Sequence, residues 1–282
     1  MENAVVLIQC PDQKGLIARI SGLVYRCEGN ILFADQHTTS AENGLFFFRL
    51  EFRFDPLLFS REKIEAAFRD LASELRAQWQ IRYGGQRLRC AVLVSSKLHC
   101  LSDLLYRHAA GELAMDLAAI ISNHADGRPW AELYGIPFIH VPAGPELRAQ
   151  SEAAILEHVR DTDFLVLARY MQVLSPDFLA AYGRDIINIH HSFLPSFKGS
   201  APYQQAYERG VKIIGATAHF VTEDLDEGPI IEQVVHKVSH RDDVEALKRK
   251  GSDLERMALT QALSAYTHHK VIRHKNKTIV FE

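Results

Sequence analysis

Residues 185–195 read Asp-Ile-Ile-Asn-Ile-His-His-Ser-Phe-Leu-Pro, and the second half of the chain is organised around this stretch. The apolar pair Ile186–Ile187 indicates a strand that enters a core. Asn188 and His190 follow at alternate positions, so their side chains are expected on the same side of that strand. Pro195 lacks a backbone donor and ends regular strand pairing. The sequence therefore predicts a carboxamide and an imidazole side by side at the mouth of a strand, where ligands bind in α/β sheets.

Length and composition are those of an ordinary globular protein. With 282 residues the chain exceeds the usual domain of about 100–150 residues, so two domains are expected. Apolar residues make up 47% and charged residues 24%, and the net charge of -3 gives no electrostatic case for binding nucleic acid. No apolar run reaches the length of a membrane span, and the first residues carry no basic targeting region. We expect a soluble, cytoplasmic protein that binds neither nucleic acid nor a membrane.

The first 84 residues predict a small domain with the element order βαββαβ. Its helices are expected to begin at Leu16 and after Ser60, and its strands to cover residues 4–9, 31–39, 45–54 and 79–83. This order is that of a split βαβ module of the ferredoxin-like type. Gly84-Gly85-Gln86 reads as a flexible junction. We therefore place the two domains at residues 1–84 and 85–282.

The second domain alternates strands and helices. Strands are expected at residues 90–94, 115–122, 138–141, 164–167, 185–188, 213–221 and 230–238. Helices are expected at residues 101–109, 129–134, 149–160, 201–209 and 243–265, with a short helix starting at Pro176 and a terminal hairpin at 271–281. Such alternation predicts an α/β fold with a doubly wound, mostly parallel sheet. The loop after the first strand, Ser95–His99, contains neither GxGxxG nor a Walker lysine, so a nucleotide site is not expected.

Three groups near the end of the central strand suit acyl transfer without a covalent intermediate. Asn188 can donate a hydrogen bond to a carbonyl oxygen, and His190 donates more strongly when it is protonated. Asp226 lies in an acidic loop, from which it can orient and deprotonate a water or hold the imidazole in its cationic form. Each residue alone is more often structural, because such residues commonly form turns or satisfied core contacts.

Residues 1–84 resemble the ACT family of regulatory domains, through Pro11–Leu16 before the first helix and Gly29-Asn30 after it. ACT domains often bind an amino acid between the first loop and the first helix, usually at a dimer interface. The resemblance implies a homo-oligomer, methionine or glycine as candidate effectors, and effector contacts at Asp12, Lys14, Gly15 and Asn30. Gly15 and Asn30 also have a purely structural interpretation, since both residue types supply turn conformations.

Residues 188–195 resemble the Asn-x-His-x-Ser-x-Leu-Pro motif of the folate-dependent formyltransferases. Residues 215–220 and 222–229 are similar to that family's next strand and to its aspartate loop, which ends in Leu-Asp-x-Gly-Pro. Residues 168–176 match the segment that lines its pterin pocket. The resemblance covers about residues 88–238 and implies a catalytic domain that binds a folate.

Within that superfamily the chain resembles the deformylase branch. An ACT-like domain precedes the catalytic one, a second histidine follows His190, and residues 202–212 look like the deformylase version of the next helix. Residues 95–99 also lack the glycine- and asparagine-containing turn with which glycinamide ribonucleotide transformylase holds its substrate phosphate. The resemblance implies hydrolysis of 10-formyltetrahydrofolate to tetrahydrofolate and formate. The formate would feed purine synthesis, and the reaction would balance the one-carbon folates.

The same resemblance implies roles for individual residues. Asn188 and His190 would polarise the formyl oxygen, while Asp226 would activate or position water and relay a proton toward the folate nitrogen. His219 would support the site from the neighbouring strand. Apolar side chains would pack the pterin and the backbone of the acidic loop would bond its edge, which assigns substrate binding to Met171, Val173, Leu174, Thr222, Glu223 and Asp224. The folate is the substrate, and no separate cofactor is expected.

Three other interpretations stay open. Fourteen histidines suggest a metal hydrolase, but no HExxH is present and His190 and His191 are expected on opposite faces of an extended chain. We therefore expect no metal. A formyltransferase to an amine would depend on an added acceptor. An amino-acid sensor built on an inactive transferase fold would turn over no folate, and the intact set of Asn188, His190 and Asp226 argues against it.

Overall fold

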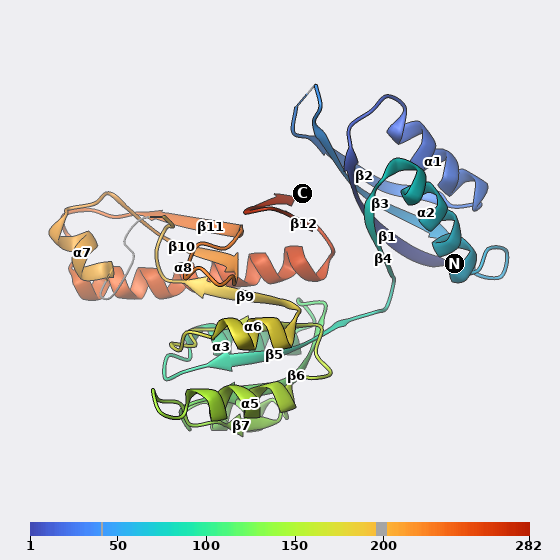
Figure 1. The fold of residues 1–282 in the computed structure, drawn as a ribbon. Coiled ribbons are helices and arrows are strands. Elements are labelled where there is room, and N and C mark those ends of the chain that lie inside the picture. The colour runs from blue at the N-terminus through green and yellow to red at the C-terminus, as the bar shows by residue number, and fades with distance from the viewer. Residues whose placement is uncertain (41, 196–201) are drawn as a thin grey trace. The chain divides into compact units, whose positions relative to one another are not determined.

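The computed structural model describes residues 1–40, 42–195 and 202–282, which form two compact units (Figure 1). One unit comprises Met1–Gln86 together with two short pieces of the C-terminus, His269–His274 and Ile279–Glu282. The other unit comprises Arg87–His268 and Lys275–Thr278. The polypeptide therefore passes between the units more than once, although each unit has its own sheet.

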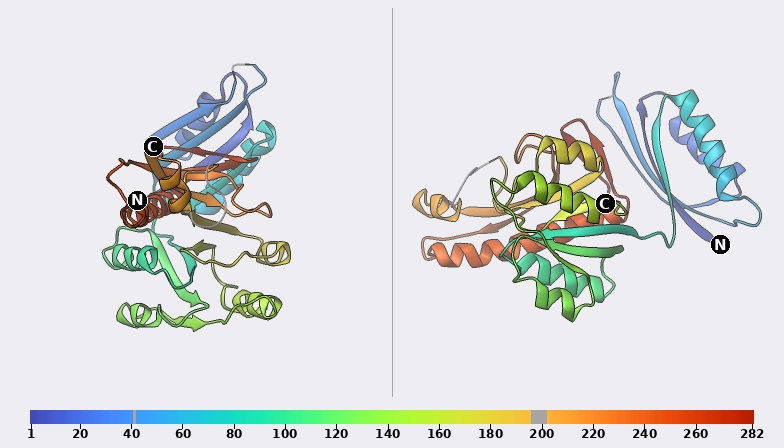
Figure 2. Two further views of the ribbon diagram at one scale, coloured as in Figure 1. Left: turned by 90° about the vertical axis from the view of Figure 1, so that its left-hand side faces the viewer. Right: turned by 60° about the horizontal axis from the view of Figure 1, so that its bottom comes forward.

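The first unit is built on a four-stranded antiparallel sheet with the order β2-β3-β1-β4. Its strands are β1 (Glu2–Pro11), β2 (Asn30–Thr38), β3 (Leu45–Phe54) and β4 (Gln78–Tyr83). Two helices, α1 (Leu16–Arg26) and α2 (Arg61–Leu75), cover one face of the sheet, as the right-hand view of Figure 2 shows. The predicted ferredoxin-like βαββαβ fold is confirmed.

The two faces of this first sheet are buried by different parts of the chain. Alternate residues of β1, from Ala4 to Cys10, face the helices and belong to the larger core. Leu7 faces the other way and packs with Phe47 of β3, and this pair is covered by Ile272 and Phe281. These last residues belong to the terminal strands β12 (Val271–His274) and β13 (Lys277–Val280) and to the residue that follows them. The hairpin was predicted, but its packing against the first sheet was not.

The second unit contains a seven-stranded sheet with the order β11-β10-β9-β8-β5-β6-β7. The five strands from β9 to β7 in that order are parallel, while β10 and β11 run antiparallel at one edge. The strands are β5 (Leu88–Val94), β6 (Met115–Ser122), β7 (Phe138–His140), β8 (Phe164–Leu167), β9 (Asp185–His190), β10 (Ile213–Phe220) and β11 (Ile230–Lys237). The predicted doubly wound, mostly parallel sheet is confirmed.

Helices cover both faces of the larger sheet. Those of this unit are α3 (His99–Ala109), α4 (Arg128–Leu133), α5 (Arg148–His158), α6 (Pro176–Tyr182), α7 (Pro202–Glu208) and α8 (Val244–Thr267). α5 and α6 contribute to the core on one face, whereas α8 packs on β9, β10 and β11 and against α3. The predicted cap of α6 is present, because the Ser175 hydroxyl accepts a hydrogen bond from Phe178 N. Ala201, where the sequence predicts the start of α7, lies outside the described residues.

The register of β9 decides which side chains meet at its end. β9 pairs with β8 so that Asn188 lies beside Leu167, the last residue of that parallel strand. On its other side β9 pairs with β10, which places His219 directly across from Asn188 and Thr217 across from His190. Residues directly opposite each other in an antiparallel pair have neighbouring side chains. The carboxamide predicted from the sequence therefore gains an imidazole neighbour from the next strand.

The longest helix, α8, is packed tightly against α7 at one glycine. Its N-cap is Asp243, whose side chain accepts a hydrogen bond of 2.7 Å from Ala246 N. A methyl group added at the buried Gly251 would collide with the phenol ring of Tyr203 from α7. The buried stripe of the helix repeats at helical spacing through Leu247, Gly251, Leu254, Glu255, Ala258, Leu259, Ala262 and Leu263.

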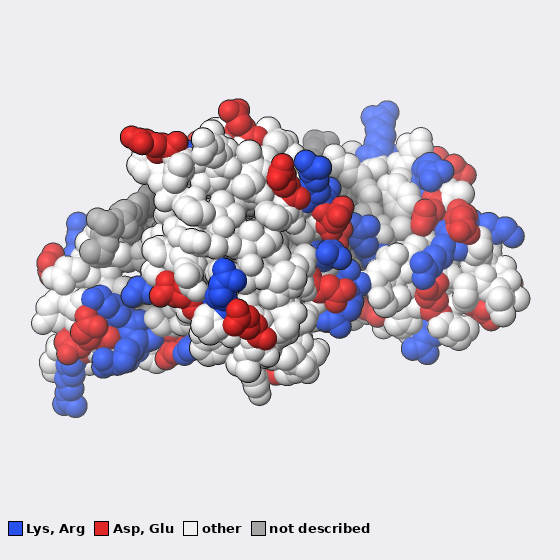
Figure 3. Space-filling view, turned by 90° about the horizontal axis from the view of Figure 1, so that it is seen from below, with Lys and Arg blue, Asp and Glu red and all other residues white. Residues whose placement is uncertain are grey.

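Figure 3 shows one face of the molecule with its charged side chains, and most basic side chains there have acidic neighbours. Among the described residues, both signs are mixed over most of this face. Among the described residues, no helix is both long enough and apolar enough to span a membrane.

We expect Gly251→Ala to lower the free energy of unfolding by about 1–3 kcal/mol, because overpacking a closed contact outweighs the better helix propensity of alanine. The added methyl would displace the ring of Tyr203. Urea unfolding followed by circular dichroism measures the change. Ser252→Ala, at the next position of the same helix, is the control and should shift stability by less than about 0.5 kcal/mol. Equal stability of the two variants would contradict the packing described.

Candidate active site

A cavity of about 340 Å³ lies at the carboxyl ends of β8 and β9. Its walls are the segment from Arg169 to Leu174, the end of β9 and the loop from Val221 to Asp226. Every residue predicted as catalytic, supporting or substrate-binding lines this one cavity: Asn188, His190, His219, Asp226, Met171, Val173, Leu174, Thr222, Glu223 and Asp224. The structure brings these side chains together, while their individual roles stay predictions.

His219 fixes the orientation of the Asn188 carboxamide. Its Nδ1 lies 2.9 Å from the carbonyl oxygen of Phe220, so we assign the ring proton to Nδ1. Nε2 is then an acceptor, and Asn188 Nδ2 donates to it over 3.2 Å. Burial lowers the pKa of His219, although the Phe220 carbonyl and Asp226 act in the opposite direction. The neutral ring therefore holds the amide so that the second hydrogen of Asn188 Nδ2 is available to a ligand.

His190 and Asp226 form the second pair in the cavity. His190 Nδ1 donates to Asp226 Oδ1 over 3.2 Å, and the His190 side chain is 7% exposed. Burial raises the pKa of Asp226, but the hydrogen bond and charge of His190 outweigh burial, and the net pKa is lowered. The carboxylate is thus ionised and accepts the hydrogen bond from the His190 ring. His190 Nε2 is buried and has no hydrogen-bond partner among the described residues, so it is the atom left for a ligand.

Ser95 holds the apolar wall of the cavity in place. Its backbone nitrogen donates to the carbonyl of Arg169 over 3.1 Å, and its hydroxyl accepts from Met171 N over 3.0 Å. In the same segment Met171 and Val173 are more than half exposed, whereas Leu174 is buried. Two apolar side chains are therefore free to pack on a flat ring that enters the cavity.

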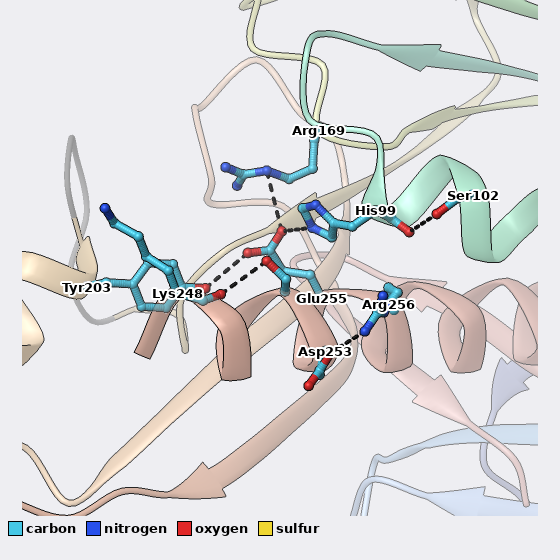
Figure 4. A network of polar contacts seen from close by, with 9 residues as sticks. His99, Ser102, Arg169, Tyr203, Lys248, Asp253, Glu255 and Arg256 are labelled. Atoms are coloured by element: carbon cyan, nitrogen blue, oxygen red, sulfur yellow. Dashed lines mark hydrogen bonds and ion pairs between the residues drawn. The ribbon is translucent and has the colours of Figure 1, made fainter. Parts of the chain in front are cut away.

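A buried carboxylate next to the cavity was not predicted from the sequence. Glu255 of α8 is 2% exposed and accepts hydrogen bonds from His99 Nε2 at 2.7 Å and from Tyr203 Oη at 3.0 Å (Figure 4). Arg169 Nε lies 3.4 Å from the same carboxylate. Burial raises the pKa of Glu255, but the hydrogen bond from His99 and the charge of Arg169 lower it further than burial raises it. The only signal in the sequence was an acidic residue in the apolar stripe of a helix.

His99, Cys100 and Glu255 are the one group among the described residues whose ligand atoms lie close enough together to hold a metal ion. The group does not fit a metal. Cys100 is fully buried, and burial raises the pKa of its thiol, whereas a metal ligand must be a thiolate. The guanidinium of Arg169 beside Glu255 also opposes a second cation. The interpretation of the cluster as an ion-pair network is therefore preferred.

His191 also lines the cavity, which contradicts the expectation that His190 and His191 face opposite ways. The two ring centroids are 5.0 Å apart, and the ring of Tyr203 lies 6.4 Å from His191. The reason is that β9 ends at His190, so strand alternation no longer applies to the next residue. Burial, followed by the charges of Arg169 and His190, lowers the pKa of His191 to about 4. Its ring is neutral at pH 7.

The residues predicted as effector contacts lie in the first unit, around the start of α1. Gly15 is the N-cap of α1 with a φ of +84°, a conformation that favours glycine. Asp12 N donates to the carbonyl of Gly44 over 2.9 Å, which closes the loop against the β2–β3 turn. Lys14 and Asn30 are exposed. Binding of an effector here stays a prediction.

The formyl transferase family matches residues 88–263, which is the greater part of the second unit. The catalytic unit is thus a formyl transferase domain. The formyltetrahydrofolate deformylase of Bacillus subtilis is 45% identical over 98% of this chain and 93% of its own length. That of Synechocystis sp. is 47% identical over the whole of both chains. The chain belongs to the formyltetrahydrofolate deformylase family.

Solved structures agree with this assignment. A formyltetrahydrofolate deformylase from Pseudomonas syringae superposes with a TM-score of 0.95 at 44% identity, over 100% of this chain and 95% of that one. A glycinamide ribonucleotide transformylase from Symbiobacterium toebii superposes with a TM-score of 0.66 at 31% identity, over 71% of this chain and 97% of that one. The likeness to the deformylase therefore extends over both units.

We expect Glu255→Gln to cost about 3 kcal/mol of unfolding free energy at pH 7, since it leaves buried partners without their charge. The pKa of Glu255 is lower in the folded chain than in the unfolded chain. Its carboxylate therefore stabilises the folded state at pH values above the unfolded pKa of about 4.3. That contribution is lost as the pH falls through the lower folded-state pKa. The difference from wild type in urea unfolding should therefore shrink in acid. Asp253→Asn, an exposed neighbour on α8, is the control, and a pH-independent deficit for Glu255→Gln would contradict the prediction.

Proposed function

We infer that the protein hydrolyses 10-formyltetrahydrofolate to tetrahydrofolate and formate. The observation that carries this proposal is that Asn188 Nδ2 and the buried His190 Nε2 are left for a ligand in a cavity that also contains the ionised Asp226. The carboxamide N–H, and the imidazole N–H when the ring is protonated, suit the oxygen of a formyl group on which negative charge develops. Similarity to deformylases along the full chain supports water as the acceptor.

In the proposed reaction the formyl oxygen binds between Asn188 and His190. The oxygen of a water molecule forms a bond to the formyl carbon, and the electron pair of the C=O bond moves to the oxygen held by the two donors. The carbon–nitrogen bond then breaks as the C=O bond is restored, and the folate nitrogen takes a proton. Asp226 orients the attacking water, takes its proton and passes that proton to the folate nitrogen, which restores the carboxylate beside His190.

The folate is proposed to lie along the apolar wall. Met171 and Val173 expose their side chains to the cavity and Leu174 closes its base, which suits stacking against a pterin. The opposite wall is the acidic loop, where the Thr222 hydroxyl donates to the carbonyl of Asp224 over 3.1 Å and so fixes the loop's shape. The backbone groups of Thr222, Glu223 and Asp224 would bond the polar edge of the pterin.

Further parts of the proposal concern control and setting. Residues 1–84 are proposed to form an ACT-type regulatory domain that binds an amino acid such as methionine or glycine. The protein is also proposed to form a homo-oligomer. The released formate would supply purine synthesis and adjust the balance of one-carbon folates. A cytoplasmic setting is supported by the four cysteines, which are all buried and free, as is usual in reducing compartments.

Formate release from 10-formyltetrahydrofolate, measured without any acceptor amine, tests the proposed activity. Asn188→Ala and Asp226→Asn should each reduce formate release by about 100-fold or more, on the scale of a lost oxyanion donor, while circular dichroism stays unchanged. Glu227→Gln, an exposed carboxylate next to Asp226, is the control and should retain activity. Near-wild-type turnover in both site variants would refute the assignment. Turnover that requires an added amine would identify a formyltransferase instead.

Effector binding is tested by calorimetry on the full chain. Titration with methionine or glycine should release or absorb heat in the wild type and not in Asn30→Ala, because the carboxamide at the start of β2 would no longer contact the ligand. Catalytic activity without effector should be the same in both proteins. Absence of heat with both amino acids would contradict the prediction and leave the first unit with an assembly role.

A further inference from the structure

Arg169 occupies an unusual position at the edge of the cavity. Its backbone has a φ of +65°, in the left-handed region that non-glycine residues rarely adopt. The chain on both sides is fixed, because Ala168 N donates to the Leu93 carbonyl at 2.9 Å and Ser95 bonds Arg169 and Met171. From this backbone position the Arg169 side chain reaches Glu255 of α8. Such conformations persist where the surroundings enforce them, and they concentrate at functional sites.

The Arg169 guanidinium is incompletely paired even though its side chain is only 13% exposed. Its Nε is buried and lies 3.4 Å from Glu255 Oε2 without the geometry of a hydrogen bond. Figure 4 shows the other end of the guanidinium pointing away from that carboxylate. Among the described residues, no hydrogen bond to this end is present. A largely buried cation at a cavity wall, whose outer donors have no partner among the residues that the structure describes, is a place for an anion.

A chain of contacts connects this cation with the formyl-binding donors. His191 lies between them, with its ring 5.0 Å from His190 and 6.4 Å from Tyr203. Tyr203 in turn donates to Glu255, the ion-pair partner of Arg169. Because His191 is neutral, it adds no second positive charge, and Arg169 is the one permanent cation among the described residues that line the cavity.

The proposed reaction creates an anion that the substrate does not contain. The formyl group is a neutral amide, whereas the product is a carboxylate whose two oxygens come from the formyl group and from water. At the end of the reaction the carbon–nitrogen bond is broken. One proton of the water is on the folate nitrogen, and the other has dissociated from formic acid, so that the product is formate. The negative charge arises next to the ionised Asp226, which repels it. A cation at the cavity wall, such as the Arg169 guanidinium, offsets this repulsion.

We propose that Arg169 binds the carboxylate of formate as it forms, as an anion subsite of the deformylase centre. The planar guanidinium offers parallel N–H donors that match the two oxygens of a carboxylate. Glu255, His99 and Tyr203 act as positioning residues, because they hold the Nε side of the guanidinium and leave its far end to the product. This proposal rests on the proposed hydrolysis, and it assigns Arg169 a role after water has attacked.

Product inhibition by formate measures the subsite during turnover. Arg169→Gln should raise the inhibition constant for formate by about tenfold or more, the loss expected for charge-assisted hydrogen bonds, while the KM for 10-formyltetrahydrofolate changes by less than about twofold. Arg169→Lys keeps the positive charge but loses the parallel N–H donors of the guanidinium. The inhibition constant for formate should therefore rise by an intermediate amount. Arg256→Gln is the matched control: it removes a cation next to Glu255 that pairs with the exposed Asp253 outside the cavity, and it should leave the inhibition constant unchanged.

Direct binding of ¹³C-labelled formate, followed by line broadening in NMR, separates this proposal from the proposed function. Broadening is expected with the wild type and with Arg256→Gln, and it should be lost in Arg169→Gln whether or not folate is present. Unchanged formate inhibition in Arg169→Gln, or a rise in KM with no change for formate, would overturn the proposal. If the wild type released no formate from the folate yet broadened the formate signal, the hydrolysis would fail while the subsite stood. If Arg169→Gln does not fold, the formate inhibition constant of Arg169→Lys decides whether Arg169 binds formate.

Discussion

The antiparallel pairing of β9 with β10 is the constraint on which the rest of the catalytic unit depends. It sets Asn188 opposite His219, and the neutral ring of His219 then dictates how the carboxamide is turned. A shift of β9 by one residue in this register would send the side chain of Asn188 to the other face of the sheet, away from His219. The same pairing fixes where β10 ends and hence where the loop that carries Asp226 begins. The positions of Asn188, His219 and the Asp226 loop are therefore held by main-chain hydrogen bonds between strands and not by side chains alone.

Two carboxylates at or next to the cavity each have a nitrogen partner. Asp226 accepts from His190, and Glu255 pairs with Arg169, while the ring of His191 is neutral. Each buried charge has an opposite partner, as is required where solvent is scarce. The pairs differ in what they leave free. His190 retains an unused nitrogen beside Asn188, and Arg169 retains the outer part of its guanidinium. We propose that these two groups act at different stages of one reaction.

Much of the fold and the central site follows from local sequence. Apolar runs bounded by polar residues predict β3, β6 and β8 with the bounds that the structure has, because strand length is set by where burial ends. Strand alternation likewise predicts that Asn188 and His190 share a side. The Glu255 network could not be predicted, since it joins residues that are distant along the chain and its acidic member interrupts an ordinary apolar stripe. The partner of the terminal hairpin was missed for the same reason.

The terminal hairpin has a consequence for how the protein is made. Ile272 and Phe281 complete the burial of one face of a sheet whose strands all lie within the first 83 residues. During synthesis the N-terminal sheet emerges first and can pair its strands and bury its helix-covered face. Leu7 and Phe47 on the opposite face stay uncovered until residues 271–281 have been synthesised. A protein shortened before residue 271 would therefore carry an exposed apolar surface on its first-made sheet.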